Sequence, residues 1–135
     1  MYTNTSMTIY NKKYDKRQRL DTYKRTVIDK VFWDESKAYN RLQSGLENSD
    51  EVNIFIPFDA ITDKEYIDPI EYKKLDNTEG YFTLSVGDRV VRGSIDLEIN
   101  KPTDLDEHYE AFTITSVDDK RFGSTRMRHW QLGAK

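Results

Sequence analysis

The chain has 135 residues, 33% of them charged and 13% aromatic, so it can bury the core of one domain and is too rich in aromatic residues for a disordered segment. It contains no cysteine, which excludes disulfides and thiolate metal sites. No run approaches the roughly 20 apolar residues of a membrane-spanning helix, and the N-terminus carries no apolar signal segment. We therefore expect a protein that is used in the cytoplasm, or assembled there into something larger.

The charges are distributed unevenly along the chain. Residues 1–33 carry eight Lys or Arg against three Asp or Glu, residues 34–119 carry eight against twenty-one, and residues 120–135 carry five against none. The net charge of −3 therefore divides into +5, −13 and +5. Two interpretations stay open. The charges mix on a solvated surface after folding, or they form a polarised surface that orients one copy against the next or against a partner.

The first part of the chain has the alternating pattern of short strands. We expect a strand at 5–10, a basic loop at 12–19, a long strand at 20–33, a returning strand at 37–42 and a strand at 52–57 that Pro57 closes. The long strand has apolar residues on both faces, with Tyr23, Val27 and Trp33 on one face and Ile28 and Phe32 on the other. This pattern predicts a strand that passes into a second environment, such as a subunit contact.

Residues 58–80 do not have a strand pattern and form a long excursion. Asp68 as N-cap, Pro69 at the first position and Glu71 in the first turn predict a short helix that ends near Leu75. The segment is acidic, yet it carries more apolar residues than a freely solvated loop should. Two alternatives stay open: it docks on a neighbour or projects from the domain, or it caps one end of its own domain.

The last part again predicts strands. We expect a hairpin of 81–86 with 89–92, a bulge or close backbone approach at Gly93, and one apolar face formed by Val91, Ile95, Leu97 and Ile99. One helical turn capped by Thr103 should follow within 102–109. Strands at 111–117 and 127–132 flank a turn at 118–124.

The fold class predicted by these elements is mainly β. Seven or eight short strands and one long excursion with a short helix fit a small antiparallel β-barrel, because closure removes the sheet edges. We expect a single domain over 1–135, with a basic N-terminal segment (1–19) and the excursion (58–80) projecting from the barrel.

The sequence offers no catalytic, cofactor-binding or metal site. Ser124 follows Gly123 without a nucleophile-elbow motif, and His129 lies in a strand pattern. Asp104, Asp106 and His108 have donor types that bind divalent cations, but the stretch lacks the glycine and closing ligand of a calcium loop, which favours a solvated acidic turn. We therefore predict a non-enzymatic protein with no small-molecule substrate.

The basic stretch within 1–19 has the residue types that contact nucleic acid. Its Lys and Arg residues alternate with tyrosines, which supply phosphate contacts and stacking surfaces. The acidic middle of the chain opposes a polyanion, so an acidic protein surface is the favoured partner. A nucleic-acid-binding β-barrel regulator remains the alternative from another class.

Several strings also carry a family resemblance: residues 19–28, 54–57, 80–93 and 112–124, with Arg128-His-Trp130 at the end. Together they resemble a poorly characterised family of small virion proteins encoded in the head–tail region of tailed phages of Gram-positive bacteria. The resemblance spans about residues 9–135. It implies a virion structural protein, assembled in the host cytoplasm, that forms a ring around the DNA channel as a head–tail connector or head-closure (neck) component. A tail-completion ring is the structural alternative.

The resemblance also implies partners. They are further copies of the chain, a portal-side adaptor and tail proteins, with genomic DNA passing through the ring without tight binding. From their size, charge and position, we expect ten residues to form interfaces: Tyr14, Arg17, Arg19, Trp33, Tyr66, Ile70, Tyr72, Arg126, Arg128 and Trp130.

Overall fold

A computed structural model of the chain describes residues 3–36, 51–60, 62–120 and 128–135. The fold is mainly β, as predicted, and its centre is an antiparallel sheet of six strands. Their hydrogen-bonded order is β1-β2-β3-β8-β7-β6, and β6 pairs with β1, so the pairing closes on itself. The strands are β1 (Thr5–Asp15), β2 (Leu20–Ser36), β3 (Glu51–Pro57), β6 (Arg89–Arg92), β7 (Ala111–Lys120) and β8 (His129–Ala134).

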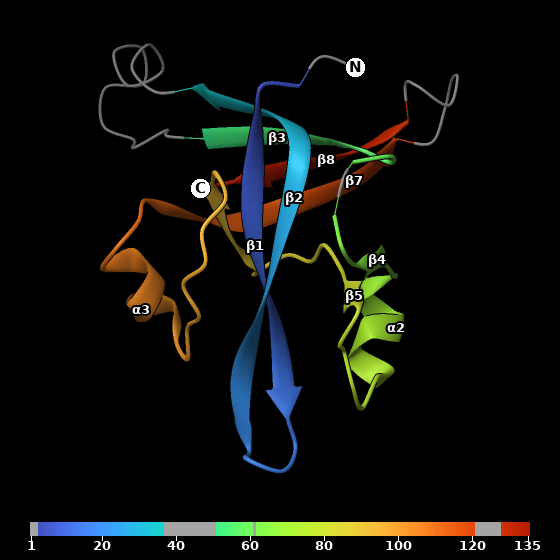
Figure 1. The fold of residues 1–135 in the computed structure, drawn as a ribbon, viewed down its shortest axis with the longest axis vertical. Coiled ribbons are helices and arrows are strands. Elements are labelled where there is room, and N and C mark those ends of the chain that lie inside the picture. The colour runs from blue at the N-terminus through green and yellow to red at the C-terminus, as the bar shows by residue number, and fades with distance from the viewer. Residues whose placement is uncertain (1–2, 37–50, 61, 121–127) are drawn as a thin grey trace.

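Four shorter elements lie outside this sheet. β4 (Glu65–Tyr66) and β5 (Tyr81–Phe82) form a separate parallel pair, so the predicted hairpin between 81–86 and 89–92 is wrong. β6 instead lies between β1 and β7. The helices α2 (Pro69–Lys74) and α3 (Pro102–Asp106) lie on opposite sides of the β1–β2 hairpin (Figure 1). The strand predicted at 37–42 and most of the turn predicted at 118–124 fall outside the described residues.

The main core fills the inside of the closed sheet. Alternate residues of β3 and β8 point into it, including Ile54 and Leu132, which are fully buried. Every strand of the closed sheet contributes at least one buried apolar side chain to this cluster. Because each inward side chain removes apolar surface from water, this shared interior is what stabilises the closed arrangement.

A bulge explains the two-faced apolar pattern of β2. Met7 pairs with Ile28 and Thr5 pairs with Val31, so β2 contains one extra residue at this point. Lys30 takes a left-handed backbone conformation there, with φ 64°. The bulge reverses the alternation, so Ile28 and Val31 both face the core. The bulge therefore accounts for the buried apolar residues of both predicted faces, whereas Val27 and Phe32 are only half-buried, and a subunit contact along β2 stays a prediction.

A second apolar cluster covers the outer face of the sheet. Tyr10 and Val91 pack there against Ile99 and Leu105, so the shared face predicted for Val91 and Ile99 does form. Residues 93–100, however, are an irregular segment laid over the sheet and not a strand. The Tyr10 hydroxyl donates to the Leu97 carbonyl at 2.6 Å, and burial raises the pKa of Tyr10 to about 12.

Backbone hydrogen bonds secure the start of this outer segment. Gly93 has φ 96°, and its N–H donates to the Ser6 carbonyl at 2.8 Å. The Thr8 hydroxyl donates to the Gly93 carbonyl and accepts from the Ile95 N–H. The left-handed φ explains the glycine, whereas the predicted close approach is not found, since a Cβ at Gly93 would meet no atom within 4 Å.

The N-cap predicted from the sequence is found in one helix and not in the other. The Asp68 side chain accepts from the Ile70 N–H at 2.9 Å, which confirms the predicted N-cap of α2. The predicted Thr103 cap of α3 is wrong, since that helix begins at Pro102 and Lys101 occupies its N-cap position. The Asp104 carboxylate instead accepts from the N–H groups of Asn100 and Lys101.

Candidate functional site: a basic β-hairpin arm

The first two strands extend well beyond the rest of the sheet. β6 pairs with β1 only over Met7–Tyr10, and β3 pairs with β2 only from Phe32 onward. The remaining part of the β1–β2 hairpin is a two-stranded ribbon that projects from the molecule (Figure 1). We call residues 12–24 the arm. The prediction of a basic loop at 12–19 is wrong, because half of that stretch continues β1.

The end of the arm is a tight turn. The Asp15 carboxylate accepts from the Arg17 N–H at 2.9 Å and from the Gln18 N–H at 3.4 Å. Arg19 completes the turn with φ 56°, before β2 begins at Leu20. The turn therefore holds its basic residues in a defined loop, and all of residues 16–20 are exposed.

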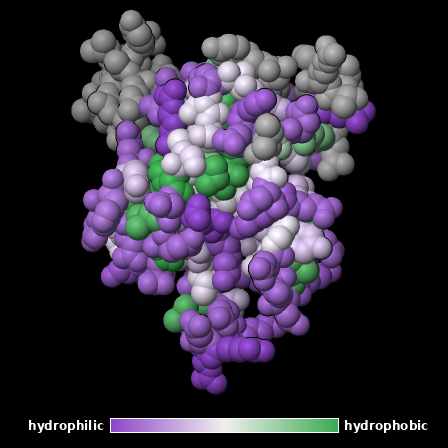
Figure 2. Space-filling model, viewed as in Figure 1, coloured by the Kyte–Doolittle hydropathy of each residue, from purple (hydrophilic) through white to green (hydrophobic). Residues whose placement is uncertain are grey.

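The arm is basic. It carries six Lys or Arg against two Asp, a net charge of +4. Tyr14 and Leu20 are exposed by 54% and 48%. In Figure 2 the end of the arm is mostly hydrophilic with an isolated hydrophobic patch. Because exposed charge and exposed apolar area occur together here, the arm has the composition of an interaction surface.

A buried polar cluster holds the arm where it leaves the sheet. Beyond Tyr10, β1 has no pairing with β6, and the Lys12 N–H donates to the Asp88 carboxylate at 3.1 Å. The Asn11 side chain donates to the other Asp88 oxygen at 2.8 Å and to the Thr83 carbonyl at 2.7 Å. These bonds replace the missing strand pairing, so the root of the arm is fixed.

Asp88 is the unusual member of this cluster. Only 3% of its surface is exposed. Burial raises the pKa of its carboxyl group to about 6, although the hydrogen bonds from the Lys12 N–H, the Asn11 side chain and the Ser85 N–H oppose the shift. The sequence signal, an Asp after Gly87 in a turn, did not distinguish it from a solvated turn residue.

The root of the arm has further contacts on both sides. The Lys13 ammonium donates to the Lys73 carbonyl at 2.7 Å, at the end of α2. On the other side, the Arg25 guanidinium donates to Glu98 at 2.9 Å and to the Ile95 carbonyl at 3.0 Å. Since these contacts end near the root, the outer part of the arm stays uncovered.

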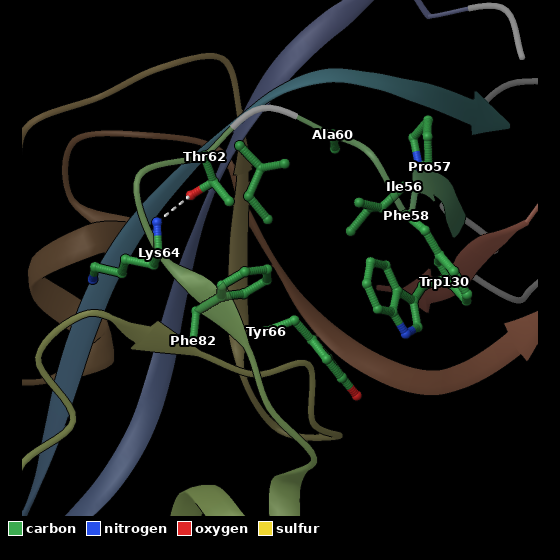
Figure 3. A pocket seen from close by; sticks show the side chains of 10 residues that line it. Ile56, Pro57, Phe58, Ala60, Thr62, Lys64, Tyr66, Phe82 and Trp130 are labelled. Carbon is green, nitrogen blue, oxygen red and sulfur yellow. Dashed lines mark hydrogen bonds between the residues drawn. The ribbon is translucent and has the colours of Figure 1, made fainter. Parts of the chain in front are cut away.

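The excursion caps the core beside the arm. Tyr66 packs on Trp130 with ring centroids 4.5 Å apart, and it packs edge-on against Phe82. Ile56, Phe58, Trp130 and neighbouring side chains enclose a pocket of about 140 Å³ under this segment (Figure 3). The buried part of residues 58–80 therefore caps one end of its own domain, which was one of the two alternatives for this segment.

Lys64 turns inward at the rim of this pocket. Its ammonium donates to the Arg25 carbonyl at 2.6 Å and to the Thr26 hydroxyl at 2.9 Å. Burial lowers the pKa of Lys64. Two hydrogen bonds thus hold the ammonium against β2, while the neighbouring charge of Asp63 favours its protonated form.

The structure separates the ten predicted interface residues. It brings Tyr14, Arg17 and Arg19 together on the arm, and Ile70 and Arg128 are exposed elsewhere. Three predictions need correction. Trp33, Tyr72 and Trp130 are 2%, 1% and 8% exposed, because their large rings fill the chain's own interior. Tyr66 is half-buried, and Arg126 lies outside the described residues.

The acidic turn considered as a cation site has protein partners. Asp104 accepts from the backbone at the start of α3, and Asp106 pairs with Arg89. In the part of the chain that the structure describes, no group of three or more metal-binding side chains is gathered.

Fold and arm together define a mainly-β protein from which a basic ribbon projects. The chain belongs to a family of unknown function, DUF6751, which matches residues 2–135. No curated protein and no solved structure shows significant similarity to it. Among the described residues, no helix is long and apolar enough to span a membrane.

Proposed function

We propose that the chain is a structural protein of a tailed-phage virion. In this proposal it is a head–tail connector or head-closure (neck) component that assembles as a ring around the DNA channel. The projecting basic arm is the observation that carries the proposal, since a ring subunit needs an element that reaches a neighbour. The resemblance over residues 9–135 and the closed sheet, taken as a small antiparallel β-barrel, support it.

The charge distribution supports a ring in particular. Ring closure needs a contact between two unlike surfaces of the same chain. The arm carries +4, whereas residues 58–80 carry seven Asp or Glu against three Lys, a net charge of −4. A channel that passes DNA should also not bind it tightly, which suits an acidic middle. The partners are copies of the chain, a portal-side adaptor and tail proteins, and the site of action is the virion.

Two other functions fit specific observations. A tail-completion ring would use the same closed sheet and arm at another position in the particle. A nucleic-acid-binding regulator would use the arm itself, because its lysines, arginines and Tyr14 are exposed on one ribbon. We propose no enzymatic role.

The test is the location of the protein. Genes for portal and capsid proteins beside the coding gene, and the protein in the neck of purified particles by labelled electron microscopy, are the expected results. A protein absent from particles would overturn the proposal, and one located in the tail would favour the tail-completion ring.

A shortened arm adds a structural test. Lys13 and Thr22 face each other in the β1–β2 ladder, so an Asn-Gly turn can join them in place of residues 14–21. We expect this variant to melt like the wild type but to leave particles incomplete. Normal particle completion with the shortened arm would contradict a role for the arm.

A further inference from the structure

The end of the arm presents apolar surface on both of its faces. Tyr14 pairs across the ribbon with Asp21, and Asp15 pairs with Leu20, so Tyr14 and Leu20 point to opposite sides. Both are about half exposed, between the basic residues of the turn. A two-stranded ribbon has no interior in which to bury them. A partner that covers this end must therefore offer both negative charge and an apolar contact.

The chain itself carries a surface with this composition. Over residues 63–71 the carboxylates Asp63, Glu65, Asp68 and Glu71 are exposed, and Ile70 is exposed by 66%. The one lysine of this stretch, Lys64, is turned inward to β2. We call residues 63–71, formed by β4 and the first part of α2, the acidic face.

We propose that the end of the arm of one copy docks on the acidic face of a second copy. This contact rests on the proposed ring and names the surfaces that build it. Lys16, Arg17 and Arg19 would lie against the carboxylates, and Leu20 or Tyr14 against Ile70. Charge complementarity and matched exposed apolar residues favour a second copy over an unrelated partner, since the chain supplies both halves.

In the contacts that the structure describes, the basic residues at the end of the arm do not pair with the acidic face of their own molecule. Arm and α2 are joined by Lys13 near the arm's root, at the C-terminal end of the helix, whereas residues 16–20 are exposed. Each copy thus offers one arm and one acidic face. Repetition of such a contact between unlike surfaces generates a ring if the rotation closes.

The contact should be weak between free copies. Exposed ion pairs contribute little each and are screened by salt, so the interface needs the high local concentration of an assembly. A covalent trap detects such a contact. Because the chain has no cysteine, every disulfide comes from the introduced thiols, and a size tag on one of the two variants separates the mixed dimer from the homodimers that also form.

Two single-cysteine variants form the test. Gln18→Cys places a thiol in the turn of the arm without removing a charge, and Ile70→Cys places one on the acidic face. Thr103→Cys, at an exposed position of α3, is the matched control. When Gln18→Cys is mixed with each of the others under mild oxidation at low salt, we expect the 18–70 dimer to form about tenfold faster than the 18–103 dimer.

Charge reversal separates specific docking from general attraction. Arg17→Glu with Arg19→Glu, added to the Gln18→Cys chain, should remove that advantage. Glu65→Lys with Glu71→Lys, added to the Ile70→Cys chain, should remove it as well, and mixing the two reversed chains should restore it. All these positions are exposed, so thermal melting should stay near that of the wild type.

These results test the contact between copies separately from the proposed role in the virion. Equal rates for the 18–70 and 18–103 dimers, or no restoration by the double reversal, would overturn the docking proposal even if the protein lies in the neck. An 18–70 dimer that follows the charge pattern supports the contact even if particles lack the protein, and the proposed function would then fail alone.

Discussion

At the scale of single residues, burial separates side chains that look alike in sequence. Trp33 and Tyr14 are both large aromatic residues in the basic N-terminal part of the chain. Trp33 is 2% exposed and packs edge-on against Phe112, with centroids 5.8 Å apart, whereas Tyr14 is 54% exposed on the arm. The first position therefore acts on stability, and the second is available to a partner.

Substitution of these two residues should show the difference directly. We expect Trp33→Ala to lower the free energy of unfolding by about 3–5 kcal/mol, because it removes a buried ring and leaves a cavity. Tyr14→Ala should change it by less than about 0.5 kcal/mol. Urea denaturation followed by circular dichroism measures both. Wild-type stability for Trp33→Ala would restore that residue to the list of interface candidates.

The buried Asp88 should make stability depend on pH. Its folded pKa of about 6 lies above its ordinary value of 3.8, so between these pH values the folded state binds more protons than the unfolded state. The contribution of Asp88 to stability is therefore greatest at low pH and falls as the pH rises through this window, by up to about 3 kcal/mol.

We test this contribution with Asp88→Asn, which cannot titrate. Compared with the wild type, the variant should lose the decline in unfolding free energy between about pH 4 and 6. Asp96→Asn, at an exposed carboxylate, is the control for the loss of one acidic group. If Asp88→Asn and the wild type have parallel pH profiles, the carboxyl group of Asp88 does not titrate in this window.

At the scale of elements, the arm extends away from the core, whereas the excursion packs back against it. The arm is pinned by Asn11 and Asp88 and then leaves the sheet. The excursion returns to the sheet through Tyr66, which packs on Trp130, and it buries Tyr72 while part of its surface stays exposed. A long insertion is thus both a structural cap and a surface, and single substitutions can separate the two roles.

Two residues of α2 separate them. Tyr72 is 1% exposed and Ile70 is 66% exposed, although both lie on the same short helix. We expect Tyr72→Ala to cost about 3–5 kcal/mol of unfolding free energy, from the loss of a buried aromatic ring, and Ile70→Ala to cost almost nothing. Thermal melts decide this, and equal losses would mean that α2 does not pack as described.

At the scale of the whole molecule, the polarised charge predicts weak self-association of the isolated protein. The candidate contact surfaces consist of exposed charges with few apolar residues, unlike obligate interfaces. At micromolar concentration and physiological salt, light scattering should show mainly monomer. A stable large ring at low concentration and high salt would contradict this expectation.

The same charge distribution predicts poor binding of DNA. The arm attracts phosphates, but the −13 of residues 34–119 opposes a long polyanion. Fluorescence titration with duplex DNA at about 150 mM salt should give a dissociation constant above the micromolar range. Submicromolar affinity that is lost when Lys12, Lys13, Lys16 and Arg17 become Ala would favour the nucleic-acid regulator.

Local sequence patterns are sufficient to predict much of this fold. The alternation in 52–57 predicted β3, and the Asp68-Pro69 start predicted α2 with its cap, because both depend on residues close in sequence. The mainly β class and the basic charge of residues 12–24 could also be predicted, since they follow from the alternation of apolar residues and from composition.

The tertiary structure decided which side chains are covered and which strands meet. One extra residue at Lys30 reverses the alternation of β2, and β6 pairs with β1 rather than with its neighbour in sequence. The arm exists only because β3 and β6 stop short of the β1–β2 turn. These features depend on pairing between distant segments, which local propensity does not specify. The sequence by itself therefore determined the fold class and the charges, whereas long-range pairing decided where the interaction surface lies.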